Sequence, residues 1–577
     1  MKLIDLFTKN LTPAQKQYEA VRAVAFGEDT LNGIARRFGY TAGSLNTLVN
    51  RVRSGKQSLF PEVRKGPRGP RTAPEILKKI VKLRRKAKIS SREIRNELEK
   101  AGIRIGVRTV ERALADAGFP KLQRRTREEM GLTTKGTAIP MRCEGLDLKD
   151  LKPFRAECQV AGVFLFLPYI IESGLLDIVS QCPLPESRDV GKTHAALSML
   201  LVKLIGGERL SHTRQYDTDR GFGLFAGLNV LPKPTWMCTY SCRATEPLLL
   251  DFQSRVMARL RSLYPDLYDG KTINLDFHSI PHFGDKPEME KVWCGARGKA
   301  MKGANTFFAQ DGDTNQVLYA RADIKRAESS DEIKKFIDFW VGVKGVVDET
   351  LVFDAKVTRY DVLCDLDQAG VRFITLRIKN KKLVQETLRI PDSQWEKVYL
   401  PIPKRKHKHV KVYESRVTLI KGGPSFRQIA IKDHGRAQPS FVLSNHENLK
   451  VKDVLAIYAR RWHIENKLAE LVKFFNLNAL SSPFMVRIHF DILWTIIADS
   501  LYHLLARDLR RFERLRAPSL FRQFIDIPGE VHYDGKKIMV RIRKRAATPV
   551  LLAVEKLNRE TPVPWLDNRP LQIVWTP

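Results

Sequence analysis

The chain has 577 residues, of which 43% are hydrophobic and 28% are charged. This balance excludes a mostly disordered protein, and the length exceeds the ~250–300 residues at which a single core stops growing, so several domains are expected. Lysine and arginine number 99 against 64 acidic residues, which gives a net charge of +35. The excess favours a polyanionic partner, such as nucleic acid or an acidic membrane surface.

Membrane insertion and secretion are not expected. The most apolar stretch, Val160–Ile171, is interrupted by Pro168 and is shorter than the ~20 residues of a spanning helix. The first ten residues lack the apolar segment of a secretory signal. The one close cysteine pair, Cys238 and Cys242, has no second pair that would complete a zinc site. We therefore expect reduced thiols and a cytoplasmic, nucleoid-associated protein without a membrane partner.

Positive charge is concentrated near the N-terminus. Residues 1–130 contain 30 lysines and arginines and 13 acidic residues, a net charge of +17. Such clustering is typical of surfaces that neutralise phosphate groups. The segment is patterned rather than repetitive, and it predicts two helix-turn-helix units, over residues 1–60 and 74–128.

In the first unit, Asp29 or Thr30 is expected to cap a helix that Gly39 ends, and Thr41 to cap the next helix. The outward face of that second helix is predicted to carry Ser44, Asn46, Thr47, Arg51 and Arg53. Asparagine and arginine pair bidentately with adenine and guanine edges. Asn46 and Arg51 are therefore candidate DNA-recognition residues.

The second unit begins with a capping box formed by Ser90 and Glu93. Gly102 ends this helix, and residues 107–115 are expected to form the next one. Its outward side chains are predicted to be Arg108, Thr109 and Arg112. Two such units in tandem within a strongly basic segment favour DNA binding more than either unit alone.

Residues 61–73 form a basic linker between the two units, in which proline and glycine prevent helix formation. Arg68 and Arg71 are candidates to lie in a narrow minor groove, where the negative potential attracts arginine. A solvated linker with no DNA contact is the alternative.

Residues 129–266 are less informative. Apolar spacing in Thr193–Leu204 and Leu248–Leu263 predicts helices. Gly221, Gly223 and Gly227 lack the strand–glycine–helix context of a phosphate-binding loop. We expect a helical connecting domain here.

Residues 267–510 are predicted to form the catalytic domain. Strands are expected over Thr272–Asp276, Asn305–Gln310 and Gln316–Asp323, and then a helix that Ser329 caps and that reaches about Lys344. A strand over Thr350–Asp354, a helix over Arg359–Gln368 and a strand over Val371–Ile378 follow. Three antiparallel strands followed by right-handed helical crossovers give a mixed sheet with helices outside it, the ribonuclease-H-like order. The fold class is therefore multidomain α+β.

Two acids end strands that are expected to be neighbours. In this strand order the ends of the first and fourth strands lie side by side, so Asp276 and Asp354 are predicted to meet. Two carboxylates held together repel each other and favour a hard divalent cation. Oxygen ligands favour Mg²⁺ or Mn²⁺ over Zn²⁺. His278 and His282 are not expected to bind zinc, because Pro281 breaks their spacing.

A third acid is expected from a later helix, predicted over Val454–Phe475. Tyr458, Arg461 and Glu465 share one face of it, so Glu465 is the candidate and Arg461 stands beside it to hold phosphate. A surface ion pair between Arg461 and Glu465 is the alternative. Weaker candidates for the third acid are Glu470 and Asp491.

With these residues in place, the chain resembles the insertion-sequence transposases that carry an Asp-Asp-Glu triad, here Asp276, Asp354 and Glu465. The segment Tyr458-x2-Arg461-Trp462-x2-Glu465 resembles the Tyr-Arg-Glu-Lys signature of a subgroup with a β-rich insertion after the second acid. The phrases LDFHSIPHFGD and FDAKVT also resemble this group. Residues 380–450 supply the insertion, with strand-like segments at Val398–Leu400, Val410–Tyr413, Arg416–Ile420, Arg427–Ile431 and Phe441–Leu443.

The resemblance covers about residues 190–510, with one departure. The signature has its lysine seven residues after the glutamate, but that position is Val472, and Lys473 lies one residue further on. On a straight helix this shift rotates the side chain by about 100°.

The resemblance implies a DNA transposase that cuts the ends of its own element and joins the 3′ ends to target DNA. Two Mg²⁺ or Mn²⁺ ions held by the three acids are implied. Tyr458, Arg461 and Lys473 are expected to position phosphates, and Trp462 to stack on an unpaired base or to be part of the core. Work on paired ends implies at least a homodimer on double-stranded DNA. Residues 511–577 form a C-terminal region, and the basic runs Lys404–Lys411 and Lys536–Arg545 are expected along the DNA backbone. A DNA-binding regulator or a non-transposing nuclease derived from such an enzyme is the alternative.

Overall fold

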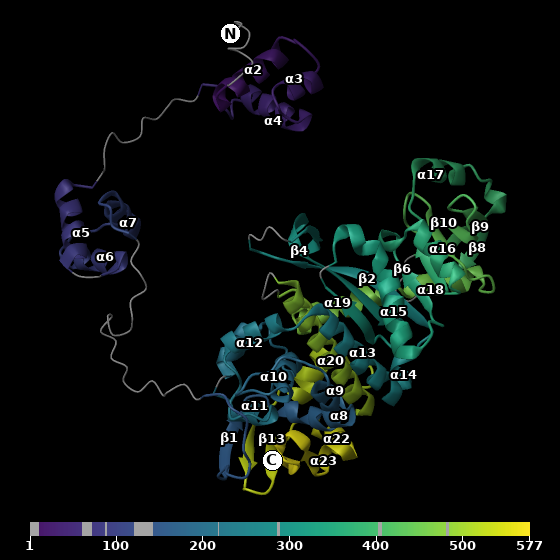
Figure 1. The fold of residues 1–577 in the computed structure, drawn as a ribbon. Helices are drawn as coiled ribbons and strands as arrows, with labels where there is room; N and C mark the ends of the chain where they lie inside the picture. The colour runs from purple at the N-terminus through teal and green to yellow at the C-terminus, as the bar shows by residue number, and fades with distance from the viewer. Residues whose placement is uncertain are drawn as a thin grey trace. The chain divides into compact units, whose positions relative to one another are not determined.

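The computed structural model describes residues 11–60, 72–86, 89–120, 142–216, 218–284, 289–322, 324–401, 407–479 and 484–577. The chain divides into two compact units, Met1–Thr137 and Ala138–Pro577 (Figure 1). Unit 1 is helical in its described residues, and unit 2 contains helices and two mixed sheets. Together they give the α+β class that the sequence predicts.

The first part of unit 1 contains α2 (Pro13–Ala25), α3 (Leu31–Arg37) and α4 (Ala42–Arg53). The Gly33 amide donates to Thr30 Oγ1 at 3.2 Å, and the Ser44 amide donates to Thr41 Oγ1 at 3.1 Å, so both predicted N-caps are confirmed. Gly39 has φ +64° after α3, a conformation that favours glycine. Ile34, Leu45 and their neighbours on the three helices form one small core.

The second part contains α5 (Pro74–Lys86), α6 (Ser91–Lys100) and α7 (Val107–Asp116). The capping box is confirmed, because the Glu93 amide donates to Ser90 Oγ while the Ser90 amide donates to Glu93 Oε2 at 2.6 Å. Gly102, with φ +79°, follows the end of α6. Ile80, Ile94 and Val110 are fully buried, one from each helix, so the three helices share a core.

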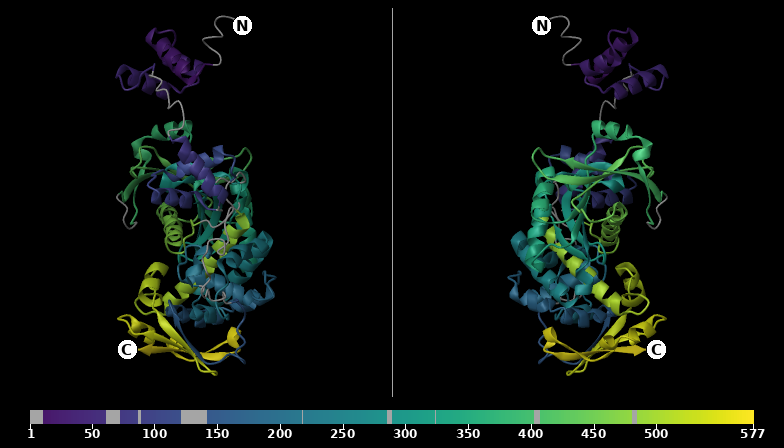
Figure 2. Two further views of the ribbon diagram at one scale, coloured as in Figure 1. Left: turned by 90° about the vertical axis from the view of Figure 1, so that its left-hand side faces the viewer. Right: turned by 90° about the vertical axis from the view of Figure 1, so that its right-hand side faces the viewer.

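The start of unit 2 is mainly helical, but it also contributes a strand that the sequence did not predict. Strand β1 (Phe154–Cys158) pairs antiparallel with β12 (Gly529–Tyr533), with Phe154 opposite Tyr533. The five-stranded sheet has the order β1-β12-β13-β15-β14 and lies at one end of the unit, where the yellow C-terminal strands stand beside the blue β1 (Figure 2). Its remaining strands are β13 (Ile538–Arg543), β14 (Thr561–Val563) and β15 (Arg569–Thr576). This sheet therefore joins the first stretch of unit 2 to its last.

The helices of this first stretch pack in one core with the rest of unit 2. They are α8 (Leu167–Glu172), α9 (Leu175–Gln181), α10 (Lys192–Leu204), α11 (Arg220–Phe225), α12 (Pro234–Tyr240), α13 (Glu246–Leu263) and α14 (Pro265–Tyr268). Across the described ranges, no single helix has both the length and the apolar character needed to cross a bilayer. One pair bent by 65°, Ala161–Glu172 with Leu175–Gln181, meets the length and composition criteria jointly.

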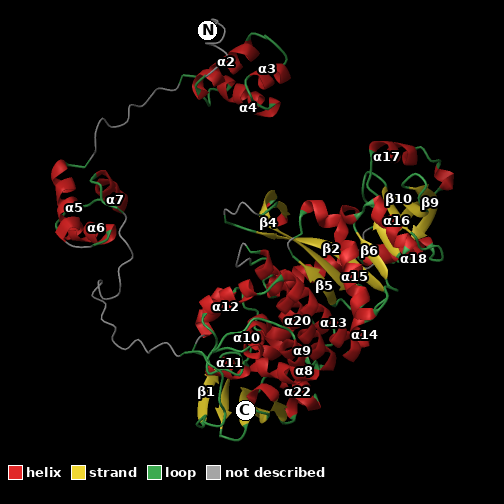
Figure 3. Cartoon of the chain, viewed as in Figure 1, coloured by secondary structure: helices red, strands yellow, loops and turns green. Residues whose placement is uncertain are grey.

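A ten-stranded sheet forms the centre of unit 2, with helices packed against it (Figure 3). The strand order is β3-β4-β2-β6-β7-β11-β10-β9-β8, and β5 pairs with β4. Its first strands are β2 (Thr272–Pro281), β3 (Lys291–Cys294), β4 (Lys299–Asp311), β5 (Val317–Arg321), β6 (Thr350–Phe353) and β7 (Phe373–Leu376). Strand β2 pairs antiparallel with β4 and parallel with β6, and β6 pairs parallel with β7. The predicted neighbours are thus adjacent, and β3 is an additional strand.

Two local predictions in this region were wrong. Asp276 does not end its strand, because β2 continues to Pro281 as the partner of β4; what ends at Leu275 is the pairing with β6. Ser329 does not cap α15 (Glu332–Lys344). A 3₁₀ turn over Arg326–Asp331 precedes that helix, and the Ser329 hydroxyl donates to the Arg326 carbonyl instead.

The segment over residues 380–450 continues the same sheet. It begins with a helix that was not predicted, α17 (Lys381–Leu388). The helix predicted over Arg359–Gln368 is α16 (Tyr360–Gln368), which lies before the insertion and precedes β7. The strands of the insertion are β8 (Glu396–Tyr399), β9 (His409–Thr418), β10 (Ser425–Lys432) and β11 (Ser440–Ser444). The two predicted strands at Val410–Tyr413 and Arg416–Ile420 are one strand, β9, which pairs with β10 along its length. Because β11 pairs with β7, the insertion extends the sheet next to the site.

The single helix predicted over residues 454–475 is two helices, α18 (Val451–Arg460) and α19 (Trp462–Phe474). At the break, the Arg461 amide donates to the Tyr458 carbonyl at 3.1 Å, three residues back rather than four. Helix α20 (Met485–Asp508) follows and is almost wholly buried. The C-terminal helices are α21 (Ala517–Leu520), α22 (Thr548–Leu552) and α23 (Glu555–Asn558).

A buried ion pair joins α19 to α20. Lys467 Nζ lies 2.7 Å from Asp499 Oδ1, and these side chains are 3% and 1% exposed. The ammonium also lies 3.0 Å from His503 Nε2, and burial together with the charge of Lys467 lowers the pKa of His503 to about 3. His503 therefore stays neutral, and the pair fixes how α19 lies on α20.

We predict that Lys467→Met lowers the free energy of unfolding by about 3–5 kcal/mol, because Asp499 is left buried without its cation. The cost should shrink on acidification, since a protonated Asp499 has no charge to bury. Urea denaturation at two pH values checks this. The double variant Lys467→Met/Asp499→Leu should recover most of the loss, and a double variant as unstable as the single one would contradict the interpretation.

Candidate active site

Two aspartates lie side by side where the pairing of β2 with β6 ends. Leu275 and Phe353 are the last paired residues of these strands, and Asp276 and Asp354 follow them directly. The Phe277 amide donates to Asp276 Oδ1 at 2.8 Å, and the Ala355 amide donates to Asp354 Oδ1 at 2.6 Å. Each carboxylate is therefore fixed by the backbone that follows it.

Arg461, at the break between α18 and α19, connects the third acid to this pair. Its Nη1 donates to Asp276 Oδ2 at 3.0 Å, and its Nη2 donates to Glu465 Oε1 at 2.9 Å. The side chains of Arg461 and Asp276 are 13% and 19% exposed, whereas Glu465 is 60% exposed. The Arg461 guanidinium thus binds two of the three predicted acids, Asp276 and Glu465, and Asp276 is the neighbour of the third, Asp354.

The charges of these groups affect one another. Burial raises the pKa of Asp276, Arg461 opposes that rise, and Glu465 and Asp354 add to it. For Arg461, burial lowers the pKa, but Tyr458 and the three acids outweigh it and raise the pKa above its usual range. The site is therefore a cluster of carboxylates that interact electrostatically and that one permanent cation partly neutralises.

Tyr458 lies next to the guanidinium, with its ring 6.0 Å from the Arg461 carbon. Burial raises the pKa of Tyr458 to about 12, although Arg461 opposes this. The phenol therefore stays protonated at neutral pH and can donate a hydrogen bond.

Lys356 is a cation near the site that sequence reasoning missed. Its ammonium lies 4.9 Å from the ring centre of Phe277, the neighbour of Asp276. Burial lowers the pKa of Lys356, and Asp276 and Asp354 act in the opposite direction. The phrase FDAKVT contains this lysine two residues after Asp354, which is the signal that could have identified it.

An open cavity of about 610 Å³ lies between Asp354 and the insertion. Asp354, Tyr458, Arg461 and Trp462 line one side. The other wall includes residues that the sequence gave no reason to select: Leu400, Ile431, His434, Arg436, Ser440 and Val442. The insertion therefore forms part of the cleft that contains Asp354.

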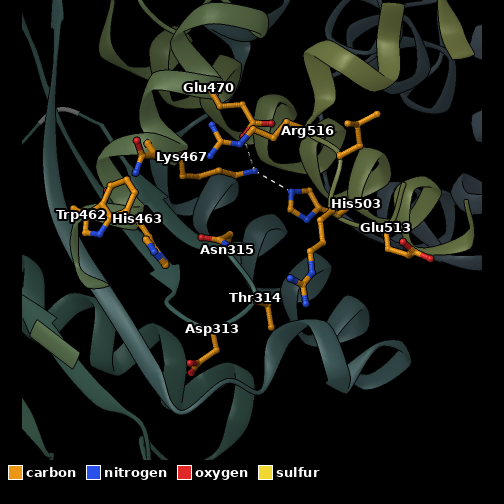
Figure 4. Close-up of a pocket in the computed structure, with 13 residues that line it drawn as sticks. Asp313, Thr314, Asn315, Trp462, His463, Lys467, Glu470, His503, Glu513 and Arg516 are labelled. Atoms are coloured by element: carbon orange, nitrogen blue, oxygen red, sulfur yellow. Dashed lines mark hydrogen bonds and ion pairs between the residues drawn. The ribbon is translucent and has the colours of Figure 1, made fainter. Parts of the chain in front are cut away.

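Trp462 also borders a second cavity, of about 530 Å³ (Figure 4). Its indole is 41% exposed, so the core role considered for it is wrong. In Figure 4, Trp462 and His463 lie at one side of this polar cavity, with Lys467, His503 and Arg516 across it. Trp462 thus lines both the cavity that contains Asp354 and this second, polar cavity.

The weaker candidates for the third acid have other partners. Glu470 Oε1 accepts a hydrogen bond from the Ala517 amide at 3.1 Å, and Asp491 pairs with the buried Lys203 at 2.7 Å. Lys473 is exposed near the end of α19, and within the described residues no contact joins it to the three acids. His278 bonds to Asn478 at 2.8 Å, and burial lowers its pKa.

The predicted DNA-recognition residues lie mainly on exposed helix faces of unit 1. Asn46 and Arg51 are exposed on α4, and Arg108 and Arg112 are exposed on α7, where Thr109 is half-buried. Arg68 and Arg71 lie outside the described residues.

The donor set fits a hard divalent cation. Asp276, Asp354 and Glu465 offer only carboxylate oxygens, which is the chemistry that Mg²⁺ and Mn²⁺ prefer. Within the ranges that the structure describes, however, no three His, Cys, Asp or Glu side chains stand close enough together to ligate one ion. The Arg461 guanidinium lies between Asp276 and Glu465, where it supplies positive charge.

Comparison with known proteins agrees with this region of the chain. Residues 267–501, which include the three acids and Arg461, match the family model described as the transposase DDE domain. No curated protein matches the chain.

We predict that Arg461→Met lowers the free energy of unfolding by about 1.5–3 kcal/mol at pH 7.5, the value of hydrogen bonds to charged groups. Arg461 stabilises the ionised form of Asp276, whose pKa burial raises, so this contribution is present above that pKa and is lost as the pH falls through it. The loss should therefore be much smaller at pH 4. Urea denaturation at both pH values measures it.

Arg460→Met is the matched control, because Arg460 is 49% exposed and its partner Asp313 lies 3.5 Å away. Such an exposed pair contributes ~0–1 kcal/mol. Equal losses for the two variants would contradict the role given to Arg461.

Proposed function

Residues 267–501 are a transposase DDE domain, and on this premise we propose that the protein is a DNA transposase. It binds the ends of its own mobile element, cuts them by metal-dependent hydrolysis and joins the 3′ ends to target DNA. The observation that carries the proposal is the arrangement around Arg461, which binds Asp276 and Glu465 and lines the same cleft as Asp354, the neighbour of Asp276. The family is one of metal-dependent nucleases and transferases.

The sheet supports a ribonuclease-H-like assignment for the domain. Taken in chain order without β3, its first five strands are arranged 3-2-1-4-5, with the first three antiparallel and the last two parallel to the first. This arrangement brings Asp276 on the first strand beside Asp354 after the fourth. Fold alone does not determine chemistry, so the proposal rests on the acids.

The three acids are the residues that would hold two Mg²⁺ or Mn²⁺ ions. When bound, the ions supply an activated water or 3′-hydroxyl and stabilise the leaving oxygen of an in-line displacement. Members of the family generally use divalent cations. The mutual repulsion of the carboxylates supports cation binding at this position, where Arg461 supplies part of the neutralising charge.

The remaining residues of the cleft orient the DNA strand. Arg461 and the protonated Tyr458 hold phosphate oxygens, the first by charge and the second by donating a hydrogen bond. Trp462, exposed between two cavities, stacks on an unpaired base at the cut end. Lys473 lies further along α19, and its flexible side chain lets the ammonium contact a phosphate.

Unit 1 recognises the ends of the element through two helix-turn-helix units, over residues 1–60 and 74–128. Helices α4 and α7 enter the major groove and present Asn46, Arg51, Arg108, Thr109 and Arg112 to base edges. Arg68 and Arg71 of the linker, residues 61–73, reach the minor groove. The exposed polar faces of these helices, opposite small apolar cores, support this arrangement.

Two ends must be held together for joining, so the working form on DNA is a homodimer or larger, acting at the nucleoid in the cytoplasm. The proposed division of unit 2 is a connecting domain (129–266), a catalytic domain (267–510) and a C-terminal region (511–577). The insertion at about 380–450 belongs to the catalytic domain, and its wall of the cleft faces Asp354.

A cleavage assay with the element's own ends and Mg²⁺ tests the proposal. Asp276→Ala, Asp354→Ala and Glu465→Ala should each abolish cutting and leave DNA binding intact. Glu470→Gln is the matched control on the same helix, since it retains the oxygen that accepts from the Ala517 amide. It should still cut.

Asn46→Ala and Arg51→Ala should give the opposite pattern. Each is expected to weaken binding of the ends relative to unrelated DNA by about 1–3 kcal/mol, with the chemistry unchanged at saturating protein. Normal cutting by Glu465→Ala would show that the third acid is misassigned. A wild-type protein that binds the ends and never cuts them would instead be a regulator.

A further inference from the structure

Strand β2 leads from Asp276 into a two-stranded ribbon beyond the paired part of the sheet. The last β2 pair is Pro281 with Gly303, and the ribbon then pairs β3 with the start of β4, from Lys291 opposite Lys302 to Cys294 opposite Lys299. In Figure 1 the start of β4 extends past the helices that flank the sheet. The ribbon is thus joined directly to the strand that carries an acid of the site.

The two faces of the ribbon differ in character. Val292 and Cys294 are 8% and 6% exposed, so one face is packed against the protein. On the other face, Trp293 is 62% exposed, and Phe283, between β2 and the ribbon, is 60% exposed. Large aromatic side chains left in solvent beside an anchored face are typical of a contact surface.

The exposed face is also basic. Lys291, on the face of Trp293, and Arg297, at the tip, are exposed, and no ion pair joins either of them to an acid in the described part of the chain. Lys299 is also exposed, but it lies opposite Cys294 and therefore on the packed face. Arg297, at the tip, stacks over the Phe283 ring with its guanidinium carbon 4.8 Å from the ring centre. The described acid on the ribbon, Glu290, accepts a hydrogen bond from the Arg326 amide at 2.9 Å. Unpaired cations next to aromatic rings are complementary to nucleic acid.

We propose that this ribbon, residues 289–302, lies in the major groove of the element-end duplex, with Lys291 and Arg297 on the phosphates and Trp293 directed into the groove. The inference rests on the proposed function, since it requires that DNA is cut at Asp276. A major groove of about 12 Å admits a two-stranded β-ribbon. Two strands spaced by about 4.8 Å, with side chains on one free face, fit that width.

The pairing register gives the expected position on the DNA. Trp293 is opposite Ala300, which is four residues along β4 from Ala304, the partner of Ile280. Ile280 is in turn four residues along β2 from Asp276. Eight residues of strand span about 26 Å. At 3.4 Å per base pair, this is about 8 base pairs from the scissile phosphate.

The element end is the duplex that this surface fits, rather than target DNA. A contact joined through β2 to Asp276 keeps a fixed register with the site. The element end occupies the site during both cutting and joining, whereas target DNA is present only for joining. A fixed register therefore serves the element end in both steps.

Dimethyl sulfate, which methylates guanine N7 in the major groove, tests this on the full-length protein bound to an element end. Wild type should protect guanines that lie inside the element, about 8 base pairs from the cut. Trp293→Ala should lose protection at these guanines and keep the rest of the footprint. Lys291→Ala/Arg297→Ala should lower the slope of log K against log salt concentration by about 2, which is ~0.9 per phosphate contact. Thermal unfolding of both variants should match wild type, since the substituted side chains are exposed.

Lys382→Ala is the matched control, because its side chain is 86% exposed on α17, at the other edge of the sheet. It should keep the protection and the salt slope. Unchanged protection in Trp293→Ala, or protection of target DNA instead of the element end, would overturn the proposal. A variant that keeps the footprint but no longer pairs two ends would assign the ribbon to a second copy of the protein and would also overturn it.

The inference and the proposed function fail in different ways. If Asp276→Ala abolishes cutting while the ribbon variants behave as wild type, only the ribbon assignment is wrong. If Asp276→Ala cuts normally, the site itself is misassigned, whatever the footprint of the ribbon variants.

Discussion

The contact on which the site depends is the one that Arg461 makes with Asp276 and Glu465. It joins residues 185 positions apart in the chain, Asp276 on the central strand β2 and Arg461 at the break between α18 and α19. Without a cation at this point, three carboxylates would repel one another at the edge of a cleft. The guanidinium therefore determines both the position of α19 relative to the sheet and the charge that a DNA strand meets.

A single sheet organises everything around this contact. Its central pair, β2 and β6, sets Asp276 beside Asp354, and the sheet extends in both directions from there. On one side, β2 and β4 lead to the basic ribbon. On the other, β7 pairs with β11, so the insertion reaches the wall of the cavity that contains Asp354. Because strands are stiff and hydrogen-bonded, these surfaces keep a fixed register with the acids.

Local signals in the sequence were reliable where the physics is local. Thr30, Thr41 and Ser90 cap helices as predicted, because a capping side chain needs only the next few amides. Asp354 follows a short buried strand as predicted, and Asp276 lies beside it. The three acids and Arg461 could thus be selected before the structure was seen.

Apart from the cap predicted at Ser329, what failed depended on distant partners. The alternating segment Thr272–Asp276 suggested a strand that ends at Asp276, but the pairing of β2 with β4 extends this strand to Pro281. Strand β1 could not be recognised alone, since its partner β12 lies more than 370 residues away. The break at Arg461 and the positions of Lys356 and Arg436 near the acids follow from tertiary packing, which periodicity does not encode.

The most direct measurement of the central claim is anomalous scattering from crystals of the protein grown with Mn²⁺. The account predicts a manganese peak bound by both Asp276 and Asp354, with Glu465 on the same side of the sheet. A manganese ion bound elsewhere, with Asp276 and Glu465 still held by Arg461 and no metal between the two aspartates, would contradict it.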